Sequence, residues 1–391
     1  MERALRILQL NSHPGPRGGA ERHVSMVTRL LADAGHQVED WAPGEASGLR
    51  ALRDRIHNPD ARAHVAARIA AFRPDVVHVH NFLRRLSPAP IVEARRAGLA
   101  TVLTVHDFQL FCPRTWAVRA DGSPCARPSL PLCLFGGCRG GLDGPMARAV
   151  YALNTLRVRR AAAVVRRATT SITAPSRSLA GRLAATLRRD VVHLPYPFPP
   201  VTPFVPPPCR DLLFVGRVGR EKGLELLLTA LAALTELRLT VAGDGPELPA
   251  CRDLVRQLGL GARVSFLGWT DAADLPSLFE RHGAVVVPSL WMENSPLAVH
   301  EALAAGRPVL GSRRGGIPEL VADGEQGLLF EPLQAALVQA LRTYAAWTQD
   351  EHTAMAVRAR TRAAAFGPDP FLGRLVQHYR DAVATARGGR A

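Results

Sequence analysis

A proline-rich seam divides this chain into two halves that repeat one pattern. Residues 195–208 hold eight prolines, at positions 195, 197, 199, 200, 203, 206, 207 and 208. Proline lacks a backbone N–H and has a fixed φ, so this density excludes a helix or a central strand and predicts a stiff, extended connector. A chain of 391 residues can bury a separate core in each half. We therefore expect a domain at 1–194, a linker at 195–210 and a second domain at 211–370.

Each half alternates short apolar segments with helical stretches. In the first half, strands are expected at 5–10, 37–41, 75–80 and 100–105, with a helix at 20–34. In the second half, strands are expected at 211–215, 238–242, 263–267, 284–287 and 308–311. This alternation favours a parallel α/β sheet. We predict two doubly wound α/β domains that face each other across a cleft, with a terminal helix within 371–391 that returns to the first domain.

The composition is globular, with a large positive charge. Hydrophobic residues make up 47% of the chain, charged residues 21%, and the formal net charge is +15. Such a charge favours a polyphosphate ligand, an anionic membrane surface or nucleic acid. Aromatic residues reach only 6% and no base-stacking module is recognisable, which argues against nucleic acid.

The sequence also bears on membranes. Residues 157–167 form a basic, partly amphipathic segment, for which a membrane-surface role and a solvated helix face are both good interpretations. No apolar run approaches the ~18 residues needed to cross a bilayer. We expect a cytoplasmic protein whose membrane contact, where present, is peripheral and on the inner face.

Only one of the forty-nine Lys and Arg residues is a lysine, Lys222. It lies in a glycine-punctuated segment, Gly216-Arg217-Val218-Gly219-Arg220-Glu221-Lys222-Gly223, directly after an apolar strand. A lysine ammonium is a compact, mobile charge that suits a phosphate oxygen, and phosphates are commonly held at such strand-to-helix turns. Chance placement of a single lysine is the alternative. The setting favours a diphosphate site.

A second segment places two carboxylates around a helix start. It reads Glu293-Asn294-Ser295-Pro296-Leu297 and continues to Glu301. Ser295 is expected to cap a helix whose first residue is Pro296. Glu293 then lies before the helix and Glu301 within it, so the two can hold different parts of one extended ligand. The alternative, a surface Glu and a capping loop, leaves Glu301 in an apolar helix without a partner.

The first half carries weaker signals. Gly18 and Gly19 open a helix whose free N–H groups suit an anion or a hydroxyl, although an ordinary turn is an equally good interpretation. His106 and Asp107 end a strand, where His106 can bind a substrate hydroxyl or carry a proton, although a single histidine at a strand end is more often structural. His78 and His80 share one face of their strand. We interpret His78 as structural and expect His80 to line the cleft.

In this order, these motifs resemble the family-4 retaining glycosyltransferases, which have two Rossmann-like domains (the GT-B fold). The resemblance rests on Gly18-Gly19-Ala20-Glu21, His106-Asp107, Gly216-Arg217 with Glu221-Lys222-Gly223, Gly243-Asp244-Gly245-Pro246, and Glu293 eight residues before Glu301. It covers nearly the whole chain. It implies transfer of a sugar from a nucleotide-diphosphate donor to an acceptor hydroxyl, with retention of configuration.

The resemblance also implies roles for individual residues. Arg217 and Lys222 would bind the donor diphosphate, Glu293 the donor sugar and Glu301 the ribose, with His106 beside the reacting centre. The remaining donor-binding positions would be Gly18, Gly19, Gly216, Gly243, Asn294, Ser295, Pro296 and Leu297. On the acceptor side we place Glu21, His80 and Asp107. Asn294-Ser295-Pro296 departs from the residues that usually follow the first Glu of the motif. The sequence does not identify the nucleotide base or the sugar of the donor.

We find no carboxylate suited to a double displacement. We therefore favour front-face substitution, in which the leaving phosphate takes the acceptor proton. Because Arg217, Lys222 and helix N–H groups supply positive charge, no catalytic metal is needed. The acceptors considered are envelope polysaccharides, lipid-linked sugars and secondary metabolites. The alternatives are a sugar-nucleotide epimerase or hydrolase on the same fold, a non-catalytic nucleotide-sugar binding protein and, from the charge, a nucleic-acid binder.

Four cysteines lie in a Gly- and Pro-rich insert at about 108–145: Cys112, Cys125, Cys133 and Cys138. An insert of this length without secondary structure usually has either a stabilising cross-link, such as a metal site, or a function. Four thiolates can bind a structural zinc, although the spacing lacks the usual CxxC pairs. Reduced thiols are about equally well supported, and disulfides are disfavoured in a cytoplasm. We expect the insert to shape the acceptor site.

Overall fold

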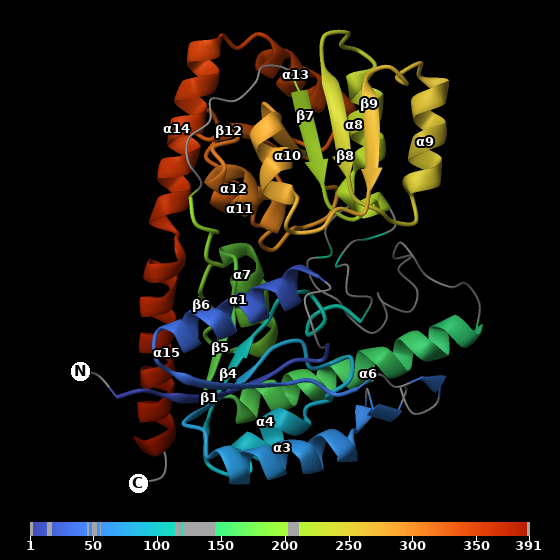
Figure 1. Cartoon of the computed structure of the whole chain (residues 1–391). Coiled ribbons are helices and arrows are strands. Elements are labelled where there is room, and N and C mark those ends of the chain that lie inside the picture. Colours follow the sequence, from blue (N-terminus) through green and yellow to red (C-terminus); the bar gives the residue numbers. More distant parts are fainter. Residues whose placement is uncertain are drawn as a thin grey trace. The chain divides into compact units, whose positions relative to one another are not determined.

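The computed structural model describes residues 3–13, 18–44, 47–48, 53–54, 56–113, 117, 119, 125, 145–201 and 211–388. The chain divides into two compact units (Figure 1). Unit 1 comprises Met1–Tyr196 and Phe371–Ala391, and unit 2 comprises Pro197–Pro370. Each unit contains one parallel sheet with helices on its faces, which confirms the predicted fold class.

Unit 1 has a six-stranded sheet in the order β2-β1-β3-β4-β5-β6. Its elements are β1 (Arg6–Leu10), α1 (Gly19–Asp33), β2 (Gln37–Trp41), α3 (Pro59–Phe72), β3 (Val76–Val79), α4 (Ala89–Arg96), β4 (Ala100–Thr104), α6 (Pro145–Ala168), β5 (Ser171–Ala174), α7 (Arg177–Leu187), β6 (Val192–His193) and α15 (Pro368–Gly388). The last of these begins at the end of unit 2. Phe371 and Tyr379 of α15 are buried in one apolar cluster with Ile7, Val76 and Val102 of the sheet.

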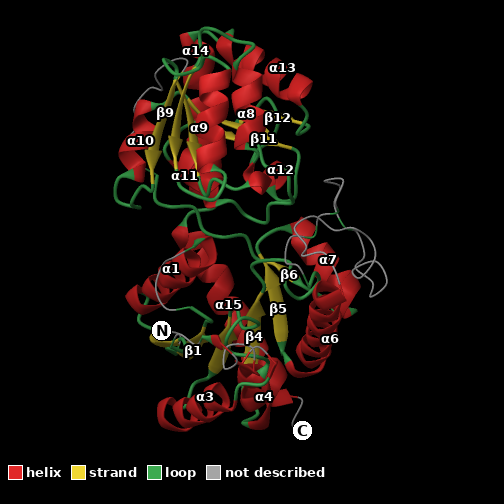
Figure 2. Cartoon of the chain, turned by 90° about the vertical axis from the view of Figure 1, so that its right-hand side faces the viewer, coloured by secondary structure: helices red, strands yellow, loops and turns green. Residues whose placement is uncertain are grey.

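Unit 2 has a second six-stranded sheet, in the order β12-β11-β10-β7-β8-β9. Its elements are β7 (Asp211–Val215), η1 (Arg220–Lys222), α8 (Leu224–Leu231), β8 (Arg238–Ala242), α9 (Leu248–Gln257), β9 (Val264–Gly268), α10 (Leu275–Arg281), β10 (Ala284–Val287), α11 (Leu297–Ala304), β11 (Val309–Ser312), α12 (Ile317–Leu320), β12 (Gly327–Phe330), α13 (Gln334–Ala345) and α14 (Gln349–Ala365). Figure 2 shows helices on both faces of its strands.

Strand β7 explains why unit 2 needs both helical layers. Alternate side chains of a strand point to opposite faces. Leu212 and Phe214 enter the cluster formed with α8 and α13, whereas Leu213 enters the cluster formed with α10, α11 and α14. A strand buried on both faces reads as a continuous apolar run, as Asp211–Val215 does after its first residue.

The strand orders place a topological switch point in each sheet. In unit 2 the chain builds outward from β7 to β9 and then returns to β10 on the other side of β7. In unit 1 the same reversal separates β1 from β3. Ligands of open α/β sheets bind beyond the carboxyl ends of the strands at such points. The loops after β7 and β10, and after β1 and β3, are therefore the first places to look for a site.

The proline-rich seam is more firmly anchored than an extended connector requires. Residues 195–201 have no regular secondary structure, yet Tyr196 is buried in unit 1 and Phe198 in unit 2. The Phe198 N–H donates to the Phe366 carbonyl at 2.9 Å, and the two rings stack with centroids 5.6 Å apart. The prolines exclude regular structure, while the aromatic residues between them attach the seam to the cores.

The anchor predicts a measurable stability effect. Phe198→Ala should lower the free energy of unfolding by about 3–5 kcal/mol, because it removes a fully buried ring and leaves a cavity. Leu333→Ala is the surface control, since Leu333 is 64% exposed, and it should change stability by less than about 0.5 kcal/mol. Urea unfolding of the two variants measures the difference. Equal effects would show that Phe198 does not anchor the seam.

Candidate active site

A partly buried ion pair joins the loops after β7 and β10, the two strands that flank the switch point of unit 2. The Lys222 Nζ lies 2.7 Å from Glu293 Oε1. The same oxygen accepts a hydrogen bond of 2.6 Å from the Ser289 hydroxyl. Glu293 is 5% exposed and the Lys222 side chain is 25% exposed, so the carboxylate is buried and the ammonium is partly accessible. An ammonium carries three N–H donors, and Glu293 orients this one at the edge of the sheet where a ligand is expected.

Two glycines allow the loops to approach closely enough for this pair. Gly223 has φ +71°, and a Cβ there would lie 2.1 Å from the Pro288 carbonyl oxygen. Gly315 has φ +60°, and a Cβ there would lie 1.9 Å from the Glu293 carbonyl oxygen. Both need the left-handed conformation and the absence of a side chain. The loops after β7, β10 and β11 thus pack backbone to backbone around Glu293.

Backbone hydrogen bonds hold the same three loops. The Leu290 N–H donates to the Glu221 carbonyl at 2.8 Å, and the Gly316 N–H donates to the Glu293 carbonyl at 2.6 Å. The Ser312 hydroxyl donates to the Ser289 carbonyl at 2.7 Å. Because these bonds fix the backbone on both sides of Glu293, the position of the Lys222 ammonium is set before any ligand arrives.

The electrostatics favour an ionised Glu293. Burial alone would raise the pKa of this carboxyl group, but the Lys222 charge and the hydrogen bonds from Lys222, Ser289 and Trp291 outweigh burial and lower it below the ordinary value. The Lys222 Nζ also lies 5.2 Å from the centroid of the Trp291 ring, within cation–π range.

The second predicted diphosphate ligand, Arg217, is also paired with a carboxylate. Its guanidinium donates to Glu221 at 2.7 Å, four residues along the chain. The Arg217 side chain is 53% exposed, whereas that of Glu221 is 8% exposed. Arg217 and Lys222 therefore both belong to the turn after β7, each next to its own carboxylate.

The start of α11 corrects two predictions. The helix begins at Leu297 with Pro296 as its N-cap in an extended conformation (ψ 118°), and no side chain caps it. The expected Ser295 cap is wrong because the Ser295 hydroxyl pairs instead with His300 Nε2 at 2.7 Å. The prediction of Pro296 as the first helical residue is also wrong by one position, because Pro296 is the N-cap. Glu293 and Asn294 lie in the loop as predicted, and Glu301 lies within the helix, half-buried.

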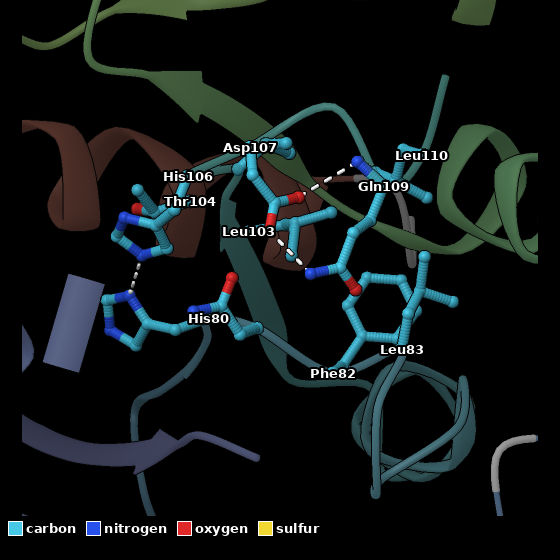
Figure 3. Close-up of a pocket in the computed structure, with 11 residues that line it drawn as sticks. His80, Phe82, Leu83, Leu103, Thr104, His106, Asp107, Gln109 and Leu110 are labelled. Atoms are coloured by element: carbon cyan, nitrogen blue, oxygen red, sulfur yellow. Dashed lines mark hydrogen bonds between the residues drawn. The ribbon is translucent and has the colours of Figure 1, made fainter. Parts of the chain in front are cut away.

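In unit 1 the predicted histidines form a buried hydrogen-bonded chain. His80 Nδ1 lies 2.9 Å from His106 Nε2 (Figure 3), and His106 Nδ1 pairs with the Tyr196 hydroxyl. At the other end, His80 Nε2 lies 3.0 Å from Gln9 Oε1. The chain links the ends of β3 and β4 to β1 and to the seam. His80 and His106, predicted as separate site residues, are thus direct partners.

The chain assigns the tautomers. The Gln9 amide donates to Thr28 and Asp40, so its oxygen faces His80 and must accept from His80 Nε2. A neutral His80 then accepts at Nδ1 from His106 Nε2–H, which leaves His106 Nδ1 to accept from Tyr196. Burial lowers the pKa of His106 to about 3 and that of His80 well below its ordinary value, so both rings are neutral. Both ring nitrogens of His106 have protein partners, and direct contact with a substrate would require one to be released.

Asp107 and His106 border a small cavity (Figure 3). Its volume is about 20 Å³, enough for one water molecule. Asp107 Oδ1 accepts from the Gln109 backbone N–H at 2.8 Å, and Oδ2 accepts from the Gln109 side chain. Burial, reinforced by the charge of Glu21, raises the pKa of Asp107 despite these hydrogen bonds. Asp107 and Glu21 are therefore electrostatic neighbours.

Other predicted positions lie where the sequence placed them. Gly18 is the extended N-cap of α1, and Gly19 is its first residue. Gly216 and Gly243 directly follow β7 and β8, and a Cβ on Gly243 would lie 1.9 Å from the Gly216 carbonyl oxygen. His78 pairs with Thr104 and with Tyr379 of α15, in agreement with its structural interpretation.

The cysteine insert is only partly described. Cys112 and Cys125 are buried, whereas Cys133 and Cys138 lie outside the described residues. Within the described part of the chain, no group of three or more His, Cys, Asp or Glu side chains is arranged to hold a metal ion. A zinc site built from the four cysteines stays a prediction.

Sequence reasoning missed Gln9, Ser289 and Tyr196. Gln9 was recognisable as a lone polar residue in an apolar strand, and Ser289 as a hydroxyl two residues after β10. Tyr196 contacts a residue ninety positions away in the sequence, and no local pattern carries that information.

Comparison with known proteins places this fold in a class. The chain resembles solved glycosyltransferases of the GT-B fold across almost its full length. Sucrose-phosphate synthase from Thermosynechococcus elongatus shares 21% identity and a TM-score of 0.70, covering 97% of this chain and 99% of the other. The Anabaena protein HepE, solved in complex with UDP-glucose, shares 18% identity and a TM-score of 0.71, covering 96% and 100%. These likenesses define the GT-B fold class.

The family follows from two sequence matches. Residues 206–362 match the family "Glycosyl transferases group 1", and residues 17–195 match "Glycosyltransferase Family 4". The chain belongs to this family of glycosyltransferases. Glycogen synthase from Mycobacterium tuberculosis is 29% identical over 83% of this chain and 82% of its own length. The D-inositol 3-phosphate glycosyltransferase of Corynebacterium diphtheriae is 36% identical, but over only 32% of each chain.

The described helices include none that is both long enough and apolar enough to cross a membrane.

The buried histidines predict acid sensitivity. Burial lowers the pKa of His78 to about 3, while an unfolded histidine titrates near 6.5. Above pH 6.5 both the native and the unfolded histidine are neutral, so this histidine adds no pH dependence to the free energy of unfolding. Below pH 6.5 the unfolded chain takes up a proton that the native state refuses, so the free energy of unfolding falls by about 1.4 kcal/mol per pH unit for each such histidine.

His78→Gln should therefore reduce the slope of stability against pH between about pH 6 and 4.5 by roughly one proton. Glutamine can still hydrogen-bond to Thr104 or Tyr379. His57→Gln is the matched control, because His57 is exposed, and its slope should equal that of the wild type. Urea unfolding at several pH values measures both. An unchanged slope in His78→Gln would contradict the neutral, buried assignment.

Proposed function

We propose that this chain is a retaining glycosyltransferase that moves a sugar from a nucleotide-diphosphate donor to an acceptor hydroxyl. The observation that carries the proposal is the Lys222 ammonium, held by Glu293 at the carboxyl ends of β7 and β10. That edge of an α/β sheet is where phosphate ligands bind. The solved HepE complexes with UDP and UDP-glucose support a nucleotide-sugar donor here.

Unit 2 would bind the donor. Lys222 and Arg217 would contact the diphosphate and stabilise the negative charge that grows on it as the sugar leaves. Glu301, half-buried on α11, would meet the ribose, and the loop 293–297 would meet the sugar. Positive charge from the protein fills the role that a metal ion serves elsewhere, so the proposal needs no catalytic metal.

Retention would proceed by front-face substitution. A double displacement needs a carboxylate that is available to attack the anomeric carbon. Glu293 Oε1 is occupied by Lys222 and Ser289, which makes it a poor nucleophile. His106, neutral with both ring nitrogens occupied, is a poor general base at neutral pH. These two observations support transfer of the acceptor proton to the departing phosphate.

The acceptor would be an envelope polysaccharide, a lipid-linked sugar or a secondary metabolite. Relatives carry names as varied as glycogen synthase, D-inositol 3-phosphate glycosyltransferase and alpha-D-kanosaminyltransferase, so relatedness alone leaves the acceptor open. The basic helix α6 in unit 1 favours an envelope or lipid-linked acceptor at a membrane surface.

The test measures the release of nucleoside diphosphate from UDP-, GDP-, ADP- and TDP-sugars, with and without candidate acceptors. A transferase releases it in an acceptor-dependent manner. A hydrolase releases it without an acceptor, an epimerase converts the sugar without releasing diphosphate, and a binding protein does neither. Conversion of the sugar without release of diphosphate, release that does not depend on an acceptor, or no reaction with any donor would contradict the proposal.

With an active donor in hand, Lys222→Ala should lower kcat/KM by about 10²–10³, the effect of losing one charge-stabilising group. Arg220→Ala is the matched control, since Arg220 is an exposed cation two residues away, and it should stay within about threefold of wild type. Lys222→Arg, which keeps the charge, should recover part of the loss. A Lys222→Ala enzyme within threefold of wild type would exclude the assigned role.

A further inference from the structure

The helices α6 and α7 form a surface from which acidic residues are absent. Residues 145–189 contain ten arginines and no Asp, Glu or Lys. In the described structure α6 and α7 contact each other on the outside of unit 1, as Figure 2 shows. A protein surface of ordinary composition mixes both signs of charge. A stretch of this length with one sign only points to an anionic partner.

An open groove of about 750 Å³ lies between these helices. Among its described lining residues are four arginines and no carboxylate: Arg159, Arg166, Arg182 and Arg188. Its floor is apolar and includes Leu110, Phe111 and Val158. Arg182 donates to the Cys125 carbonyl at 3.0 Å. Arg159, Arg166 and Arg188 have no side-chain partner among the described residues. Guanidinium groups above an apolar floor suit an anionic amphiphile.

The exposed face of α6 adds apolar side chains to this charge. Val150, Leu153 and Leu156 are 53%, 48% and 47% exposed. Leu153, Leu156 and Arg160 follow one another at spacings of three and four residues, so they lie along one stripe of the helix. An interfacial helix inserts such leucines into the outer part of a bilayer while its arginines contact lipid phosphates.

We propose that this α6–α7 basic face, made of Leu153, Leu156, Arg159, Arg160, Arg166 and Arg188, docks on a bilayer that contains anionic phospholipid. The groove receives phosphate head groups, and the two leucines enter the interface. Nucleic acid fits less well, because α6 and α7 together contain one aromatic residue for base stacking, Tyr151, and binding to a phosphate backbone gives no use for exposed leucines. The inference rests on the proposed function only in that docking brings the enzyme to an envelope or lipid-linked acceptor.

The test is co-sedimentation of the full chain with vesicles of phosphatidylcholine alone or with 30 mol% phosphatidylglycerol. Wild type should bind only the anionic vesicles. Arg159→Ser/Arg166→Ser should weaken binding about thirtyfold, the factor for two arginines near an anionic bilayer. Leu153→Ser/Leu156→Ser should weaken it about tenfold or more, through lost apolar insertion.

Two control double variants remove the same number of arginines or of apolar side chains as the test variants, but outside the α6–α7 basic face. Arg342→Ser/Arg374→Ser removes two exposed arginines outside the face, and Leu333→Ser/Val357→Ser removes two exposed apolar side chains. Both should bind anionic vesicles as wild type does. Equal weakening by test and control pairs would reduce the effect to net charge or net hydrophobicity and overturn the proposal. Absence of binding to anionic vesicles, or tighter binding to duplex DNA than to vesicles, would also overturn it.

Vesicle binding is measured without donor or acceptor, so it fails or succeeds separately from the transfer reaction. A variant of the α6–α7 basic face should keep its thermal stabilisation by nucleoside diphosphate. A Lys222→Ala variant should keep vesicle binding.

Discussion

The ion pair between Lys222 and Glu293 is the contact on which the site in unit 2 depends. It joins the turn after β7 to the turn after β10, and those strands are neighbours only because the sheet reverses its direction of growth between them. A buried carboxylate without a partner would be strongly destabilising. The pair therefore stabilises the loops and, by the same contact, sets the direction of the chain's one lysine ammonium. Gly223 and Gly315 are required because any side chain there would push the loops apart.

Unit 1 has the same sheet architecture as unit 2 but different side chains at the ends of its strands. Its strand ends carry histidines instead of a lysine. Burial lowers the pKa of His80 and His106, so both imidazoles are neutral, and the chain from Gln9 to Tyr196 gives each ring nitrogen a partner. Such a network fixes orientation without adding charge. The two units thus differ in their electrostatics: the cations that suit a diphosphate lie in unit 2, whereas the strand ends of unit 1 carry a neutral, hydrogen-bonded histidine chain.

The sequence was sufficient for the repeated sheet and for the residues at its edges. Apolar runs bounded by glycines located β7, β8 and β10 without error, since strands buried on both faces leave an unmistakable pattern. The Ser295 cap was wrong because His300, one turn into the helix, competes for the hydroxyl. The Lys222–Glu293 and His106–Tyr196 contacts were out of reach, because each spans more than seventy residues and depends on strand order. Short edge strands such as β6 were missed, since two residues carry no periodicity.

The most direct test of the account is calorimetric titration of nucleoside diphosphates, with the matching nucleosides, into wild type and Lys222→Met. If Glu293 positions Lys222 to bind a diphosphate, the nucleoside diphosphate of one base should bind to the wild type. The variant should then lose about ten- to a hundredfold in affinity for the diphosphate, the value of one charged hydrogen bond, and nothing for the nucleoside. Equal affinity of both proteins for the diphosphate would contradict the account, as would a parallel loss for the nucleoside.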